Sequence, residues 1–395
     1  MKKNIAFSFL GIVAAMFIAV NANATNGMRM IGFGPVQDSM GGVSVGLPLD
    51  AASILTNPAG MSVLPGRIDF GASYFKPSVD YKATGGANGA EIDSDRGGSP
   101  VPAFGLIVPL GDKFKFGVGA YGVAGMGVDY SANLYGSVTY TSYSQMRFAP
   151  ALSYKINDIV SVGAALNVMY ATMEFNAASA FSQLPHMGAS SLGYGATIGV
   201  LVKPTDMIQI GLAYETKSFF QDFSFNTSAG EDKIEFDQPE IATIGIGIKP
   251  VKDLLIGFDI EWINWSETNG QNLPKYTTNS SSAMPWNLNW SDQFVYKLGV
   301  QYTVNPTVVL RAGYNYGKMP LDSNRAFENI AFPAVSEHHF TAGMGINFNK
   351  QFTLNIGGMY SPSAKIDGSN MTQGISSYDT EMSQYSLDMG VTYTF

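Results

Sequence analysis

Most of the chain alternates apolar and polar residues, from near Ile68 to the C-terminal Phe395. Such alternation is typical of β-strands, because successive side chains of a strand point to opposite faces of the sheet. Turn-forming residues divide this part of the chain into segments, and we predict each segment to be one strand. The fourteen predicted strands cover residues 68–82, 101–110, 113–124, 142–156, 159–176, 190–203, 206–225, 239–249, 253–266, 292–304, 307–318, 336–349, 352–365 and 383–395.

The alternation is clearest toward the C-terminus. One face of the last predicted strand carries only apolar or aromatic residues, namely Tyr385, Leu387, Met389, Val391, Tyr393 and Phe395. The other face is small or polar, with Ser386, Asp388, Gly390, Thr392 and Thr394. A soluble β-sandwich would show the same alternation with its apolar face inward. The even strand number favours a closed antiparallel transmembrane β-barrel, whose apolar faces meet lipid.

The connections between the predicted strands alternate between short and long. Short turns are predicted near residues 157–158, 204–206, 250–253, 305–306 and 349–351. Long loops are predicted at residues 83–100, 125–141, 177–189, 226–238, 267–291, 319–335 and 366–382. Outer-membrane barrels have short turns on the periplasmic side and long loops outside. We therefore expect an all-β, fourteen-stranded barrel with this orientation.

The segment before the first predicted strand, residues 25–66, has no such alternation. It is rich in Gly, Ala and Ser and carries an Asn57-Pro58-Ala59 turn near its end. A piece of about forty residues with little periodicity cannot bury a core of its own. We therefore expect it to fold inside the barrel lumen as a plug, or hatch.

The N-terminus has the pattern of an export signal. Lys2 and Lys3 precede an apolar run over residues 5–20, and small residues follow up to Ala24. This order is typical of a signal peptide, whereas a membrane-spanning helix needs about 20 apolar residues. The expected division is a cleaved signal peptide at 1–24, a hatch at 25–66 and a barrel at 67–395.

Composition agrees with a chain that is exported to a membrane. Hydrophobic residues make up 46% of the sequence and charged residues only 14%, whereas soluble domains carry about 25% charged residues. The net charge of −8 argues against a nucleic-acid partner. These features fit a barrel in the outer membrane of a Gram-negative cell.

With these features the chain resembles the FadL/TodX family of outer-membrane transporters of long-chain fatty acids and other hydrophobic compounds. The resemblance covers the whole mature sequence. It rests on Asn57-Pro58-Ala59, the fourteen-strand pattern, Gln238-Pro239-Glu240, the segment from Asp292 to Pro320, and the ending from Gly390 to Phe395.

The resemblance implies a monomeric barrel that takes up hydrophobic small molecules passively. Ligand would be captured among the extracellular loops, released by movement of the hatch and discharged through the wall where the third strand is kinked. Here that kink falls at Gly125, Met126 and Gly127. Two glycines in three residues weaken strand pairing, although they equally suit a simple strand end.

The same resemblance implies further partners and roles. Tyr393 and Phe395 match the terminal signal that barrel-assembly machinery recognises, and outer-membrane lipid and lipopolysaccharide surround the barrel. Asn57, Pro58 and Ala59 match a hatch motif, in which the Asn side chain would satisfy buried backbone groups. The predicted lumen-facing charges are Arg147, Glu215, Asp259, Glu261, Lys297, Arg311 and Asp388, and we expect them mainly to pair and to hold the hatch.

Candidate ligand contacts are apolar residues near the predicted loops, together with two lumen cations. They are Met126, Met173, Phe175, Phe181, Leu184, Lys297 and Arg311. The fatty-acid members place basic residues after the fifth strand and before the tenth, whereas this chain has none at Met173–Ala177 or Trp290–Asp292. Uncharged aromatic or aliphatic hydrocarbons are therefore an alternative cargo, and a non-specific porin or a surface adhesin is an alternative function.

An enzyme is the main competing class. The three histidines are His186, His338 and His339, and the adjacent pair must point to opposite faces of its strand. No nucleophile motif lies near them, so we expect no catalytic site, no metal and no cofactor.

Overall fold

The computed structural model describes residues 25–84, 91–130, 139–176, 186–228, 230–270, 276–277, 288–326, 329–370 and 375–395. The predicted signal peptide lies outside these ranges. Phe181 and Leu184 also lie outside them.

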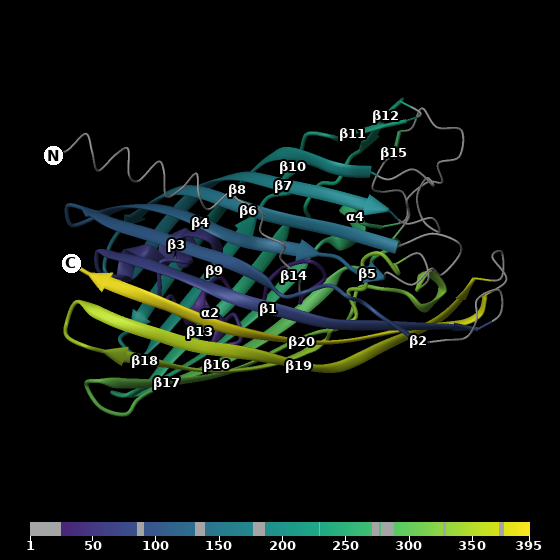
Figure 1. The fold of residues 1–395 in the computed structure, drawn as a ribbon. Coiled ribbons are helices and arrows are strands. Elements are labelled where there is room, and N and C mark those ends of the chain that lie inside the picture. The colour runs from purple at the N-terminus through teal and green to yellow at the C-terminus, as the bar shows by residue number, and fades with distance from the viewer. Residues whose placement is uncertain are drawn as a thin grey trace.

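Within these residues, fourteen long antiparallel strands form one closed barrel (Figure 1). They are β1 (Arg67–Thr84), β3 (Ser99–Leu110), β4 (Phe114–Met126), β6 (Thr139–Lys155), β7 (Val160–Asn176), β8 (His186–Thr205), β9 (Ile208–Glu215), β13 (Ile241–Val251), β14 (Leu254–Ile263), β16 (Gln293–Thr303), β17 (Val308–Gly317), β18 (His338–Asn347), β19 (Phe352–Asn370) and β20 (Ile375–Thr394). Neighbours in this order pair with each other, and β20 pairs with β1 from Thr394 opposite Arg67 upward, which closes the barrel.

The two ends of the barrel differ. One end, which we call the turn end, carries short connections and the C-terminus (Figure 1). At three of these turns an Asn side chain accepts hydrogen bonds from the second and third residues after it, as Asn157 Oδ1 does at 2.8 Å from both Ile159 N and Val160 N. The other end, which we call the loop end, carries the long connections. The predicted alternation of turn and loop lengths is therefore confirmed.

The predicted facing of side chains is also confirmed. Phe294 in β16 and Leu387 in β20 are 55% and 64% exposed on the outer face of the barrel, whereas their strand neighbours Val295 and Asp388 are buried. An apolar outer surface is stable only against lipid, so the barrel has the surface of a membrane-spanning protein. No helix among the described residues is long and apolar enough to cross a bilayer.

The strand predicted at residues 206–225 is wrong in its second half. β9 ends at Glu215, and the following residues form β10 (Phe219–Phe220) and β11 (Phe223–Thr227). β11 joins β12 (Gly230–Ile234) and β15 (Tyr276–Thr277) in a separate small sheet at the loop end (Figure 1). The alternating Phe residues were misleading because they bury one face of this small sheet rather than extend the barrel wall. The remaining short strands are β2 (Glu91–Asp93) and β5 (Asp129–Tyr130).

The N-terminal segment, residues 25–66, packs against the inward-facing side of the barrel. It contains the short helices α2 (Pro35–Asp38) and α3 (Ser53–Thr56) and the 3₁₀-helix η1 (Pro58–Val63). Nearly all of its residues are buried. The other helical turns, α4 (Trp265–Thr268) and η2 (Ser323–Arg325), belong to loop-end connections.

A belt of inward-facing glycines lets the N-terminal segment approach the wall. Thirteen of the fourteen barrel strands contribute one, and a β-carbon on each would press against residues between Pro35 and Ala59 or the adjoining wall. At Gly211 it would overlap the Val45 carbonyl oxygen, and at Gly163 the backbone of Pro58 and Ala59. This glycine belt comprises Gly71, Gly105, Gly119, Gly163, Gly199, Gly211, Gly245, Gly257, Gly299, Gly313, Gly343, Gly357 and Gly390.

The strand register aligns the belt. Gly105 lies opposite Gly119, and Gly257 lies opposite Gly299, which in turn lies opposite Gly313. The centre of the N-terminal segment is thus enclosed by backbone on almost every side. Its first residues, 25–33, lie outside this belt.

Candidate functional site

The wall of the barrel is interrupted between β3 and β4. These strands pair from Leu110 opposite Phe114 up to Ala103 opposite Tyr121, and no further. Beyond that point β3 continues to pair with β1, and β4 continues to pair with β6. We call this unpaired stretch the β3–β4 split.

Residues of the N-terminal segment pair with β4 beside the split. Met30 N donates to Val123 O at 3.1 Å, and Gly125 N donates to Met28 O at 3.0 Å. An isolated antiparallel bridge joins Arg29 to Ala124 between them. The N-terminal segment thus supplies backbone partners to the part of β4 that has lost β3.

The split is bounded toward the loop end as well. Asp95 N donates to Asp129 O at 2.7 Å, and Arg96 Nη1 donates to Thr141 O at 2.9 Å. Through these contacts the residues that follow β2 are hydrogen-bonded to β5 and β6. The split is therefore a local interruption with paired chain above and below it.

The irregularity of β4 lies slightly earlier than the sequence predicts. The register against β6 shifts between Gly122 and Ala124, so Val123 is the extra residue of a bulge. Gly125 and Met126 follow within β4, and Gly127 lies just past its end. A β-carbon on Gly122 would lie 2.6 Å from Val101 Cγ1, so this glycine marks where the side chains of β3 meet β4 across the split.

The Arg29 side chain joins a buried ionic cluster. Its Nη1 and Nη2 lie 3.4 Å from Oε1 and Oε2 of Glu215 in β9. Arg147 in β6, which is fully buried, contacts the same carboxylate. Arg147 and Glu215 were predicted to face the lumen and to hold the hatch, whereas Arg29 was missed. The available signal was that Arg29 is the one basic residue in residues 25–66.

An aromatic and methionine-rich cluster lies next to the split, on the side of the loop end. Tyr143 packs against Phe236 and Phe223 at ring-centroid distances of 5.1 and 6.4 Å, and Gln238 Nε2 joins the Tyr143 hydroxyl to the Met28 sulfur. Trp265, packed on Trp290, lies against Gly27. The start of the N-terminal segment therefore contacts both this cluster and β4.

The predicted ligand contacts fall into different places. Met126 and Met173 are buried in the apolar interior that includes the aromatic cluster. Lys297 Nζ is paired with Glu261 at 3.1 Å, and Arg311 donates to the amide oxygens of Gln301 and Asn355. Phe175 lies in β7. The structure thus places the two cations in polar networks of the wall.

Asn57 makes the contacts that its sequence context suggests. Its Nδ2 donates to Val45 O at 2.9 Å and to Val200 O of β8 at 3.2 Å. Its Oδ1 accepts from Ala59 N at 3.2 Å. Asn57 therefore ties the N-terminal segment to itself and to the wall, and Pro58 and Ala59 begin η1 beside it.

Six of the seven charged residues expected to hold this segment are buried, and Arg311 is half-buried. Asp259 Oδ2 accepts from Ser44 N and Val45 N at 2.8 and 2.9 Å.

At the turn end, the Tyr393 ring lies 4.9 Å from that of Phe352 and 6.0 Å from that of Phe395, in the outer aromatic surface. No group of three potential metal-binding side chains occurs among the residues that the structure describes.

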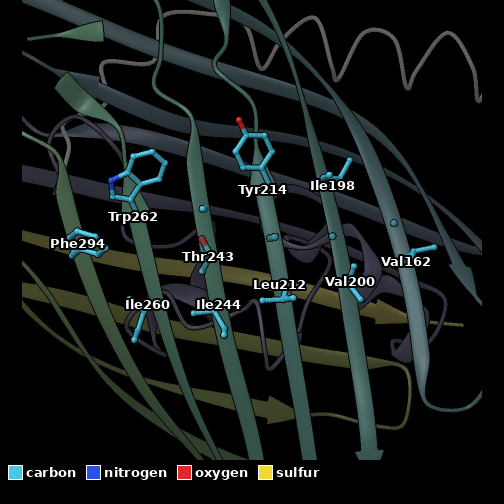
Figure 2. Close-up of a pocket in the computed structure, with 14 residues that line it drawn as sticks. Val162, Ile198, Val200, Leu212, Tyr214, Thr243, Ile244, Ile260, Trp262 and Phe294 are labelled. Carbon is cyan, nitrogen blue, oxygen red and sulfur yellow. The ribbon is translucent and has the colours of Figure 1, made fainter. Parts of the chain in front are cut away.

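A hollow of about 650 Å³ lies on the outer face of the barrel and not in its lumen (Figure 2). Its lining comes from β7, β8, β9, β13, β14 and β16, and includes the outward-facing side chains of Ile198, Leu212 and Ile244. At its loop-end rim Tyr214 donates to Glu240, and Trp262 Nε1 donates to Asp292 Oδ2 at 3.2 Å. The labelled lining residues are Val162, Ile198, Val200, Leu212, Tyr214, Thr243, Ile244, Ile260, Trp262 and Phe294. This hollow faces lipid and is separate from the β3–β4 split.

Comparison with known families identifies the barrel. The profile described as "Outer membrane protein transport protein (OMPP1/FadL/TodX)" matches residues 34–395. The chain belongs to this family. It is therefore an outer-membrane transport protein, as the sequence resemblance predicts.

Solved structures of FadL/TodX proteins have the same fold. The Pseudomonas putida toluene transporter TodX is 18% identical with a TM-score of 0.77, covering 92% of this chain and 99% of that one. A Pseudomonas aeruginosa FadL homologue is 17% identical with a TM-score of 0.77, covering 93% and 100%. The Ralstonia pickettii toluene transporter TbuX is 17% identical with a TM-score of 0.69, covering 92% and 99%. Comparison with curated protein sequences gives no significant match.

Proposed function

We propose that this FadL/TodX protein carries hydrophobic small molecules passively across the outer membrane, and that cargo leaves the lumen sideways through the β3–β4 split. The turn end faces the periplasm and the loop end faces outside. Residues 25–66 act as a hatch, and residues 25–30 move away from β4 when cargo passes.

The observation that carries this proposal is the pairing of residues 28–30 with β4. The split leaves an edge of β4 without its barrel neighbour, and a short N-terminal stretch occupies that edge through two backbone hydrogen bonds. The centre of the segment is tightly enclosed by the glycine belt, so a large movement of this central part would be unfavourable. The first residues are the part that can leave at least cost.

The interior beside the split suits an apolar cargo. Met28, Met126, Met169 and Met173 are buried there, together with the Tyr143–Phe236 pair. Flat aromatic rings and flexible thioethers accommodate hydrophobic molecules of different shapes. We infer that cargo contacts these residues after capture among the loops, and that Phe175, Phe181 and Leu184 belong to the capture surface.

Two cargo classes fit: long-chain fatty acids and uncharged hydrocarbons. Lys297 is already paired with Glu261, which disfavours it as a carboxylate receptor. Arg311 donates to neutral amide groups and is therefore the better candidate for a ligand anion. The TodX and TbuX structures are described as toluene transporters. Because Lys297 is paired, we favour the uncharged class, with fatty acids as the second candidate.

The test compares binding of palmitate and hexadecane to the purified barrel in detergent at neutral pH, followed by uptake into proteoliposomes. Binding and uptake of either compound support the proposed transport. If palmitate binds more tightly than hexadecane and Arg311→Gln abolishes palmitate binding, the cargo is a fatty acid. Lys297→Met is expected to retain palmitate binding. Failure to bind or transport both compounds would contradict a hydrophobic cargo.

The proposed setting of this transport is a monomer surrounded by outer-membrane lipid and lipopolysaccharide. Recognition of Tyr393 and Phe395 by the barrel-assembly machinery stays a prediction. Their position on the outer aromatic surface at the turn end leaves both rings in contact with the membrane side of the barrel.

A further inference from the structure

We propose that Arg147 is a positioning residue that lets Arg29 leave Glu215, and so sets how readily the N-terminal segment detaches from β4. This inference rests on the proposed movement of residues 25–30. Arg147 and Glu215 lie in β6 and β9, so they are not part of the β3–β4 split itself.

The geometry shows one carboxylate shared by two guanidinium groups. Both Arg29 contacts to Glu215 are long, at 3.4 Å, whereas Arg147 approaches the same carboxylate more closely. All three side chains are less than a tenth exposed. Arg29 is therefore the more loosely held of the two cations, and it is the one on the N-terminal segment.

Sharing changes what detachment costs. Removing one member of a simple buried ion pair leaves the other charge uncompensated, which is strongly unfavourable. Here Glu215 keeps Arg147 after Arg29 has left. Arg29, Arg147 and Glu215 together carry one excess positive charge. When Arg29 leaves, Arg147 and Glu215 remain as a neutral pair, so detachment removes the excess charge and leaves no buried charge unpaired.

The neighbouring acids keep partners as well. Glu261 remains paired with Lys297, and Asp259 remains bonded to the backbone N–H groups of Ser44 and Val45. A small cavity of about 20 Å³ lies among Arg29, Glu215, Glu261 and Lys297. No carboxylate facing this cavity depends on Arg29 alone.

Two of the three guanidinium nitrogens of Arg147 give a further sign of imbalance. Nε and Nη1 are buried and have no hydrogen-bond partner, while Nη2 contacts Glu215. A carboxylate that served Arg147 alone would be free to bond with two guanidinium nitrogens at once. Arg29 therefore competes with Arg147 for Glu215, and each weakens the hold of the other.

The experiment measures detachment directly through a single cysteine. The natural chain contains no Cys, and Met28 is completely buried, so Met28→Cys reacts with a water-soluble maleimide only when the segment opens. In this background we expect Arg147→Met to slow labelling roughly tenfold or more, because Glu215 then depends on Arg29. We expect Arg29→Met to accelerate it, and Arg147→Lys to restore the rate of the Met28→Cys parent.

Controls separate this effect from misfolding and from the proposed function. Lys155→Met removes an exposed cation at the turn end, which touches neither Arg29 nor Glu215, and is expected to leave the labelling rate unchanged. Heat-modifiable migration in gel electrophoresis confirms that each barrel is folded. If Arg147→Met does not fold, Arg147→Gln replaces it, with the same expected slowing.

The outcomes distinguish two failures. Labelling of the Met28→Cys parent at no more than its global unfolding rate would contradict the proposed movement of the segment. Labelling by local opening in the parent, with an equal rate in folded Arg147→Met, would overturn the role of Arg147 and leave the movement standing.

Discussion

The side chains of Arg29 and Glu215 meet inside the barrel, with Nη1 and Oε1 3.4 Å apart, although 186 residues separate them in the sequence. Arg29 also bridges to Ala124 through the backbone. Because β6, β7 and β8 lie between β4 and β9 in the barrel, one residue connects two distant parts of the wall. The start of the N-terminal segment is thus held both at β4, beside the β3–β4 split, and at β9.

Narrowing the split should slow transport without abolishing binding. A β-carbon on Gly122 would meet Val101 Cγ1 at 2.6 Å, so Gly122→Val fills the point where β3 and β4 separate. If the overpacking of about 1–3 kcal/mol adds to the barrier for passage, the uptake rate falls by roughly five- to 160-fold. The measurement is uptake by proteoliposomes alongside ligand binding in detergent.

The matched control for the split is Gly122→Val combined with Val101→Ala. The second change removes the side chain that the new valine meets, so uptake should recover at least in part. Equal uptake by the natural protein and by Gly122→Val would show that cargo leaves by another route.

Asn57→Ala should loosen the N-terminal segment from the wall. The change removes three hydrogen bonds inside the barrel, to the carbonyl oxygens of Val45 and Val200 and from the N–H group of Ala59. Leaving a buried group unsatisfied costs about 1–3 kcal/mol. Thermal unfolding, followed by loss of heat-modifiable migration, should therefore begin at a lower temperature.

Asn157→Ala is the control for Asn57→Ala because it makes the same chemical change in an exposed turn. Its partners, Ile159 N and Val160 N, can bond to water once the side chain is removed. A smaller loss of stability is expected. A loss as large as that of Asn57→Ala would mean that burial of Asn57 adds nothing.

A side chain in the glycine belt should displace the N-terminal segment. At Gly211 even one β-carbon overlaps the Val45 carbonyl oxygen, so Gly211→Val should destabilise the barrel by about 1–3 kcal/mol or more. Gly97→Ala is the control, because nothing lies within 4 Å of its added β-carbon. Limited proteolysis of the N-terminal segment should increase only in Gly211→Val, and an unchanged digest would contradict the close fit.

Much of the barrel follows from local sequence pattern. Alternation over β16 and β20 predicts which side chains face lipid, and Asn residues at the turn end predict the short connections. These signals are local because strand facing depends on period two and a turn depends on a few residues. The overextended prediction at 206–225 failed for the same reason, because Phe223 and Phe225 alternate with polar residues within a different sheet.

The candidate site was less predictable. Gly125 and Gly127 indicate an irregular strand end, but the bulge at Val123 and the missing β3 partner depend on pairing between strands far apart in sequence. The contact between Arg29 and Glu215 likewise forms only in the closed barrel. The sequence shows the belt glycines in thirteen of the fourteen strands, but only the strand register shows that they lie side by side.

The most direct test of the account is a reversible disulfide between the N-terminal segment and β4. Met30 N donates to Val123 O, and the two residues flank the Arg29–Ala124 bridge, so Met30→Cys with Val123→Cys places two thiols on neighbouring backbones of a chain without other cysteines. We predict that oxidation stops uptake of the bound cargo and that reduction restores it. Both single-cysteine variants should transport cargo under either condition. Uptake by the oxidised double variant at the rate of the reduced protein would contradict release of the N-terminal segment as the step that opens the β3–β4 split.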